Sequence, residues 1–276
     1  MLTAALFGLL ASSGLLIGAI IGLIASPSRR VVASIIAFGS GVLVSALTFE
    51  LMEDAFEKGN PYFVAGGFLV GALNYIGASS VLDRLAAASA TRDGRHARDV
   101  EGSDAEGEQA ETAARENNQE RGRKDSPEAA TVSGTALLVG AVLDGIPENV
   151  AIGVSLYTEG KGLGFVLLAA VFLGNLPESI GSSVGMRQEG RSRGYILGVW
   201  GAATVACTLA SVAGYALLGG LPPHLISAVL ALAAGGILAM LADTMMPEAF
   251  ENGGPAVAFA TAVGFLCAAF LSHLAH

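Results

Sequence analysis

The stretch Leu-Asp-Gly-Ile-Pro-Glu-Asn at positions 143–149 lies in the middle of a long apolar segment, roughly from Thr135 to Leu156. Its two carboxylates, Asp144 and Glu148, are four residues apart, so a helix places them on the same face. Pro147 removes one backbone N–H donor from that helix and frees a carbonyl one turn earlier. Both features are costly inside a bilayer, so the stretch predicts a functional site within a membrane helix.

The next apolar segment repeats this pattern. Positions 173–181 read Leu-Gly-Asn-Leu-Pro-Glu-Ser-Ile-Gly, so Pro177 directly precedes Glu178, and Asn175 lies three residues before that glutamate. Helices that are interrupted at corresponding positions often build the binding site of a transporter. The two segments therefore favour one shared site near the midplane of the bilayer.

Composition places the chain among membrane proteins. Of its 276 residues, 53% are hydrophobic and 14% are charged, and the mean hydropathy is +0.60. Glycine, which lets membrane helices approach each other closely, occurs 37 times. The net charge of −9 disfavours nucleic acid as a partner. Cys207 and Cys267 lie in apolar segments, so we expect buried thiols and no disulfide. These features predict an all-α polytopic membrane protein surrounded by lipid.

Eight apolar segments are long enough, at about 20 residues each, to cross a bilayer as helices. Residues 1–82 hold transmembrane helices 1–3, and residues 132–276 hold helices 4–8 of the same membrane domain. Between them, residues 83–131 are polar and contain few large apolar side chains, so we expect a disordered loop. An Ala-Phe-Glu stretch at 55–57 recurs at 249–251. This recurrence favours an inverted repeat of helices 1–3 and 6–8 around helices 4 and 5.

Basic residues gather on one side of this predicted topology. Arginines at 29–30 follow the first segment and arginines within 187–193 follow the fifth, on the same side as the loop 83–131, which holds eight Arg and Lys residues. Lys58 and Lys161 lie on the other side. Cytoplasmic loops are enriched in Lys and Arg. We therefore expect a multi-pass protein of the cell membrane with a cytoplasmic loop and both termini extracytoplasmic; homodimer formation stays open.

Four side chains on the fourth and fifth segments could surround a cation: Asp144, Glu148, Asn175 and Glu178. Carboxylates near the midplane must be either protonated or balanced by a cation. Carboxylate and amide oxygens suit Mn, Mg, Ca or Fe(II), and take Zn with lower preference. Asn149 is either a further ligand or an interhelical hydrogen-bonding group. The alternative is that the carboxylates are protonated and only hold helices together.

Acidic residues in the second and seventh segments would extend this site into a transport path. They are Glu50, Glu53, Asp54, Asp243 and Glu248. Such residues either concentrate cations at the two mouths of a path or act as neutral groups and solvated helix ends. The divalent metal ion would be the substrate, and no prosthetic group is expected.

At these motifs the sequence resembles the ZIP (Zrt-/Irt-like) family of divalent metal transporters, along nearly the whole chain. The family's helix-four pattern, His-Asn-x-Pro-Glu-Gly, corresponds to Asp-Gly-Ile-Pro-Glu-Asn at 144–149. Its helix-five pattern, a polar pair followed by x-Pro-Glu, corresponds to Gly-Asn-Leu-Pro-Glu at 174–178. The resemblance implies eight spans, termini outside, and a variable cytoplasmic loop between spans three and four.

The resemblance also implies which residues bind metal. Glu148, Asn175 and Glu178 fall on metal-ligand positions of the family. Asp144 falls where the family usually has His, and Leu43 falls where some members have a Met ligand. This site contains no imidazole, so we expect it to favour harder cations than a His-bearing relative does.

Three functions fit these observations. The first is passive or gradient-coupled import of a divalent cation of zinc, iron or manganese type, with one helix bundle moving against the other. The second is a membrane metal sensor or scaffold that does not transport. The third is an intramembrane enzyme with a carboxylate pair as acid and base. No nucleophile or hydrolase motif accompanies the carboxylates, so we expect no enzymatic activity.

Overall fold

The computed structural model describes residues 1–25, 27–101, 134–158, 161–218 and 220–275, and this part of the chain contains helices and no strand. The elements η1, η2 and η3 are π-helical and η4 is a 3-10 turn. In chain order, the elements are α1 (Leu2–Ala25), α2 (Arg29–Ala46), η1 (Leu47–Met52), α3 (Glu53–Lys58), α4 (Pro61–Glu101), α6 (Gly134–Thr158), α7 (Lys161–Gln188), α8 (Arg193–Ala213), η2 (Gly214–Leu218), α9 (Pro223–Met240), η3 (Leu241–Met245), α10 (Met246–Gly253), η4 (Gly254–Ala256) and α11 (Val257–Ala275).

Long apolar helices dominate this architecture. Within the described residues, six helical stretches are long and apolar enough to cross a membrane. This finding confirms the prediction of an all-helical, polytopic membrane protein. The six stretches are Leu2–Ala25, Arg29–Lys58, Pro61–Val81, Leu167–Gln188, Arg193–Leu218 and Pro223–Leu274.

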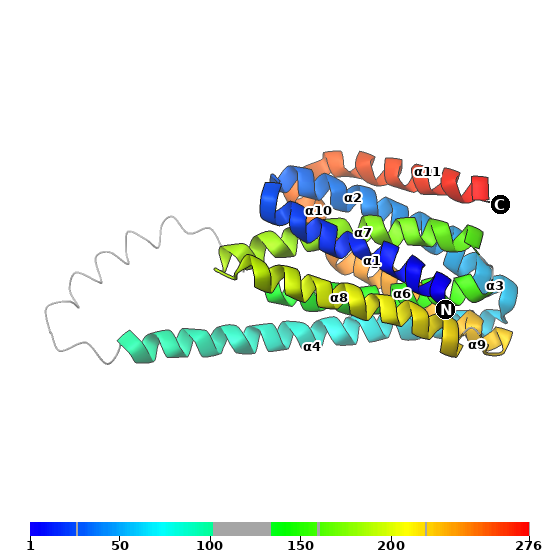
Figure 1. Cartoon of the computed structure of the whole chain (residues 1–276), viewed down its shortest axis with the longest axis horizontal. Coiled ribbons are helices and arrows are strands. Elements are labelled where there is room, and N and C mark those ends of the chain that lie inside the picture. The colour runs from blue at the N-terminus through cyan, green and yellow to red at the C-terminus, as the bar shows by residue number, and fades with distance from the viewer. Residues whose placement is uncertain (26, 102–133, 159–160, 219, 276) are drawn as a thin grey trace, which may run out of the picture.

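The helices lie side by side along the long axis of the molecule, and the two chain ends lie at the same end of the bundle (Figure 1). α1 packs against α7 and α8, and α6 also packs against α7 and α8. In the rest of the bundle, α2 packs against α11, and α4 packs against α9. We refer to α1, α6, α7 and α8 as the first helix group, and to α2, α4, α9 and α11 as the second helix group.

Glycines allow the close helix pairs of the second group. A Cβ on Gly67 of α4 would collide with the carbonyl oxygen of Ala228 on α9, and a Cβ on Gly264 of α11 would collide with that of Phe38 on α2. Such contacts between backbones are typical of membrane helices, where small residues permit close approach. Because no side chain separates these helices at the contact, their spacing is set by the backbone itself.

Side-chain hydrogen bonds hold the first group together. Serine, threonine, asparagine and arginine side chains of α7 and α8 donate to backbone carbonyls of α1. Hydrogen bonds of this kind link membrane helices in fixed register. The donors and acceptors are Ser211 to Ala4 (3.1 Å), Asn175 to Ala11 (3.3 Å), Thr204 to Ser12 (3.3 Å), Ser179 to Gly14 (3.3 Å) and Arg187 to Leu23 (2.6 Å).

The structure differs from the sequence prediction at the start of the polar loop. α4 does not end near residue 82 but continues to Glu101, and it extends past one end of the bundle (Figure 1). The segment 83–101 is rich in Ala and Arg, which are strong helix formers, and a helix that already exists is extended without a new nucleation step. The remainder of the predicted loop, 102–131, lies outside the described residues.

Candidate metal site

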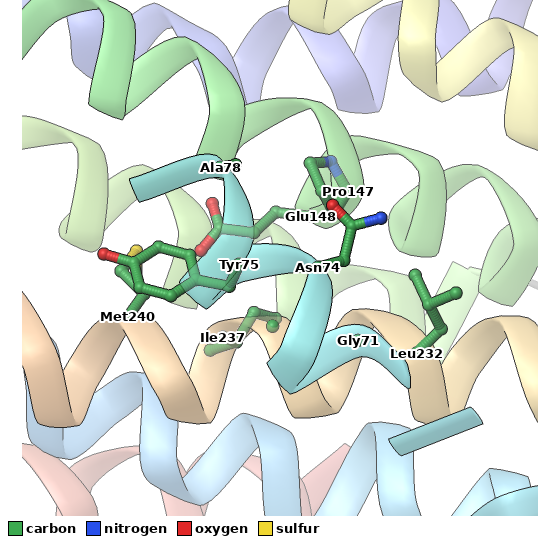
Figure 2. Close-up of a pocket in the computed structure, with 10 residues that line it drawn as sticks. Gly71, Asn74, Tyr75, Ala78, Pro147, Glu148, Leu232, Ile237 and Met240 are labelled. Carbon is green, nitrogen blue, oxygen red and sulfur yellow. The ribbon is translucent and has the colours of Figure 1, made fainter. Parts of the chain in front are cut away.

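Glu148 is a buried carboxylate in the middle of α6. The helix continues through Pro147, and the side chain of Glu148 is only 4% exposed. It lines a cavity of about 110 Å³ between α4, α6 and α9. In the view of Figure 2, the Glu148 carboxylate extends from α6 to the side of Tyr75, and the Asn74 amide lies on its other side, next to Pro147. A carboxylate is therefore directed into a space between the two helix groups.

Asn175 and Glu178 occupy the equivalent part of α7. Asn175 is 2% exposed, and its amide nitrogen donates to the Ala11 carbonyl of α1 at 3.3 Å. Glu178 is half-buried and directly follows Pro177, which lies inside the helix. Asn175 is thus packed against α1, whereas Glu148 faces the cavity beside the second helix group.

Cys207 of α8 lies against α6. Its thiol is fully buried. The thiol adjoins the backbone of α6, because a Cβ on Gly145 would lie 2.9 Å from the Cys207 sulfur. The expectation of a buried thiol holds for Cys207, whereas Cys267 is exposed on α11.

The described residues do not form a complete set of metal ligands. Among the side chains that the structure describes, no three from His, Cys, Asp and Glu lie close enough together to hold a metal ion. Asp144 belongs to α6, but its side chain lies outside the described part of the structure. Its predicted place beside Glu148 rests on the spacing of four residues along one helix.

Asn149 makes a specific link between helices. Its amide oxygen accepts a hydrogen bond from the Ser12 hydroxyl of α1 at 3.1 Å, and its amide nitrogen donates to the Gly145 carbonyl at 2.8 Å. The side chain is fully buried. Of the two roles considered for Asn149, this geometry corresponds to the interhelical hydrogen bond.

The acidic residues of the second span occupy different environments. Glu50 lies in η1 and is 3% exposed, whereas Glu53 is exposed at the start of α3. Asp54 is buried and forms an ion pair with Lys58, with 3.3 Å between the amine nitrogen and the carboxylate oxygen. The three side chains therefore differ in exposure: Glu50 and Asp54 are buried, and Glu53 is exposed.

The acidic residues of the seventh span lie on η3 and α10. Asp243 is exposed, and the Ser79 hydroxyl of α4 donates to its carboxylate at 3.4 Å. Glu248 is half-buried in the first turn of α10. Asp243 itself lies within the π-helical turn η3, and its contact with Ser79 places it against α4.

Sequence reasoning overlooked the polar residues of α4. Asn74 and Tyr75 line the same cavity as Glu148. The available signal was an amide in the middle of the apolar stretch Pro61–Val81, because polar side chains within a membrane helix usually have a functional or packing role. Asn74 was missed because the third span carries no proline-interrupted carboxylate motif to mark it.

Comparison with known proteins identifies the family. A search of curated proteins gave no match. The family model described as ZIP zinc transporter matches residues 1–275. Members of this family carry divalent metal ions across membranes and are transporters, not enzymes. Since the match extends over practically the whole chain, the protein belongs to the ZIP zinc transporter family.

Proposed function

We propose that this chain carries a divalent cation into the cytoplasm through a site that Glu148 and Glu178 share, with Asp144 and Asn175 as further ligands. The main support is the position of Glu148. This carboxylate is 4% exposed, follows a proline within a membrane helix and lines a cavity. A carboxylate is costly to bury in a bilayer unless a proton or a cation balances its charge.

The donor chemistry points to a cation of the zinc, iron or manganese type. The four proposed side chains offer oxygen donors, and oxygen-rich sites discriminate weakly among first-row metals. Imidazole, the nitrogen donor that favours zinc, is absent from these four residues. We therefore expect manganese or iron to compete well with zinc at this site.

The packing supports eight crossings arranged as an inverted repeat. α2 with η1 and α3 resembles α9 with η3 and α10, since each begins with an α-helix of 18 residues and continues through a π-turn into a short helix. The carbonyl oxygen of Phe38 on α2 lies against Gly264 of α11. In the same way, the carbonyl oxygen of Leu232 on α9 lies against Gly71 of α4. Phe38 and Leu232 are related by the same offset as the Ala-Phe-Glu stretches at 55–57 and 249–251.

The arrangement also supports the proposed orientation. Both chain ends lie at one end of the bundle (Figure 1), as an even number of crossings requires. α4 leaves the bundle at the opposite end, and its extension carries Arg84, Arg92, Arg95 and Arg98. Lys and Arg are enriched on the cytoplasmic side of a membrane, so we place that end in the cytoplasm and both termini outside.

Alternating access would follow from motion between the two helix groups. The cavity that contains Glu148 has walls from both, with α6 on one side and α4 and α9 on the other. The first group is tied internally by side-chain hydrogen bonds. It can therefore move as a unit against the second group and carry the carboxylates with it.

The test is uptake of radiolabelled zinc and manganese into proteoliposomes that contain the full chain. We expect Glu148→Ala and Glu178→Ala to abolish saturable uptake while the protein remains folded and inserted. Glu57→Ala is the matched control, because Glu57 is an exposed carboxylate of α3. Normal uptake by either site variant would remove that residue from the site, and metal binding without any uptake by the wild type would indicate a sensor or scaffold instead.

A further inference from the structure

The cavity next to Glu148 has a polar wall on α4. Asn74 and Tyr75 line it, and Asn74 is exposed, as are the adjacent Leu73 (67%) and Ile76 (53%). These two apolar side chains suit contact with lipid, but an amide in contact with lipid would lose its hydrogen bonds with water. The position of Asn74 at the cavity thus indicates that this space contains water or a cation.

The size of the cavity agrees with this interpretation. A volume of about 110 Å³ exceeds the roughly 10–15 Å³ that one water molecule needs. A buried site must also supply polar partners to hold water, and here the Glu148 carboxylate, the Asn74 amide and the Tyr75 hydroxyl can do so. A partly hydrated divalent cation therefore fits the space in both volume and chemistry.

Polar contacts continue along α4 beyond the cavity. The hydroxyls of Tyr75 and Thr244 share a hydrogen bond of 2.8 Å, and one turn further on Ser79 donates to Asp243 at 3.4 Å. Both partners belong to η3, whose π-helical turn lies against α4. The contacts connect the Glu148 cavity with an exposed carboxylate, in the direction in which α4 leaves the bundle.

We propose that this α4 wall is part of the cation path, with the Asn74 amide oxygen as a ligand beside Glu148 and the Tyr75–Thr244 pair between the cavity and Asp243. The proposal rests on the proposed transport function and assigns to the third span a direct role in it. A cation leaving Glu148 passes Asn74, then the two hydroxyls, and reaches Asp243. Amide, hydroxyl and carboxylate oxygens are all suitable ligands for a divalent cation.

The opposite face of the bundle supports the assignment by contrast. The proposed repeat relates α11 to α4 and α2 to α9. There Leu43 of α2 packs directly on α7, since its side chain would lie 2.9 Å from a Cβ on Gly174. Ile237, the residue that the repeat relates to Leu43, instead lines the cavity. The leucine side chain therefore fills the space between α2 and α7, whereas the related position on α9 borders a cavity.

The test measures whether water and metal reach Asn74. In the full chain with Cys267 replaced by Ser, Asn74→Cys and Leu73→Cys are each treated with a charged, membrane-impermeant methanethiosulfonate reagent, with and without zinc. We expect the Asn74→Cys thiol to react about tenfold faster or more, because hydrocarbon shields the neighbouring position from a charged reagent. Zinc should slow the reaction at Asn74→Cys, and adding Glu148→Ala should remove this protection.

Each other outcome contradicts the proposal. Equal reaction rates at the two positions mean that the cavity is not an aqueous space. Protection by zinc that survives Glu148→Ala means that the metal binds the introduced thiol alone. If Glu148→Ala abolishes uptake but zinc never protects Asn74→Cys, the proposed function stands and the role of α4 is wrong. If no metal is transported by the wild type, the proposed function itself fails.

Discussion

The contacts of α1 differ in kind from those of α4 and α11. α1 is joined to α7 and α8 by side chains that donate to its backbone carbonyls, including Ser211 to Ala4 and Arg187 to Leu23. α4 and α11 instead touch their partners through glycines at which the backbones meet, as at Gly67 and Gly264. The position of α1 is therefore fixed by directional hydrogen bonds, whereas the positions of α4 and α11 are fixed by close backbone packing.

This difference explains where the proposed site lies. Directional hydrogen bonds within the membrane specify one register between helices, so they suit the group that must hold Asn175 and Glu178 in place. Contacts made through glycine depend on van der Waals packing alone and allow close approach. The cavity with Glu148 lies at the boundary between the two kinds of packing, where relative motion changes its shape.

The largest effect is expected from adding a methyl group to a glycine of the second group. Gly67→Ala places a Cβ against the Ala228 carbonyl oxygen, and such overpacking typically costs about 1–3 kcal/mol. Gly66→Ala is the matched control, because a Cβ there meets nothing within 4 Å. It should be neutral or slightly stabilising, as alanine is the better helix former.

The measurement is the midpoint of thermal unfolding of both variants in detergent. A lower midpoint for Gly67→Ala, and an unchanged or higher one for Gly66→Ala, would confirm that α4 and α9 meet through their backbones. Equal midpoints would show that the α4–α9 contact is looser than described.

A change within the hydrogen-bonded group should alter metal preference instead of stability. Asp144→His introduces the imidazole that the family usually has at this position. We expect zinc affinity to rise about tenfold relative to manganese, which corresponds to about 1.4 kcal/mol. Competition uptake with mixed metals in the wild type and the variant measures the ratio. A wild type that already prefers zinc strongly, or an unchanged ratio in the variant, would show that ligand hardness does not set selectivity.

The sequence predicted the helices and the buried carboxylate, because both follow from local patterns. A long apolar run needs no partner to identify it, and Pro147 beside Glu148 marks the site within one helix. The direction of the Glu148 side chain toward α4 could not be predicted in this way. It depends on which helices pack together, and the packing is determined by backbone contacts such as Gly67 with Ala228.

Other features were hidden for related reasons. The acceptors on α1 are backbone carbonyls, which look the same at every position of a sequence. Asp243 meets Ser79 from within the π-turn η3, and no residue type marks such a turn. The extension of α4 to Glu101 was missed because a polar composition was taken to exclude a helix, although Ala and Arg favour one.

The smallest effect is expected at a single hydrogen bond to α1. Ser211→Ala removes the bond to the Ala4 carbonyl, and such bonds between membrane helices contribute about 0.6 kcal/mol on average. Thr208→Ala is the control, because the Thr208 hydroxyl donates to Thr204 within its own helix. Thermal unfolding should show a slightly lower midpoint for Ser211→Ala than for Thr208→Ala. A large loss of stability at Ser211 would mean that the bonds of this group act as a cooperative network.

The central claim is that Glu148 and Glu178, on two different helices, hold the same cation. A double-mutant cycle tests it most directly, by measuring zinc and manganese binding to the purified wild type, Glu148→Gln, Glu178→Gln and the double variant, with Glu57→Gln as control. Ligands of one ion are strongly coupled, so their substitutions are not additive. We predict that each single variant loses most of the affinity and that the double variant binds little worse than either. Additive losses, or one variant with wild-type affinity, would contradict a shared site.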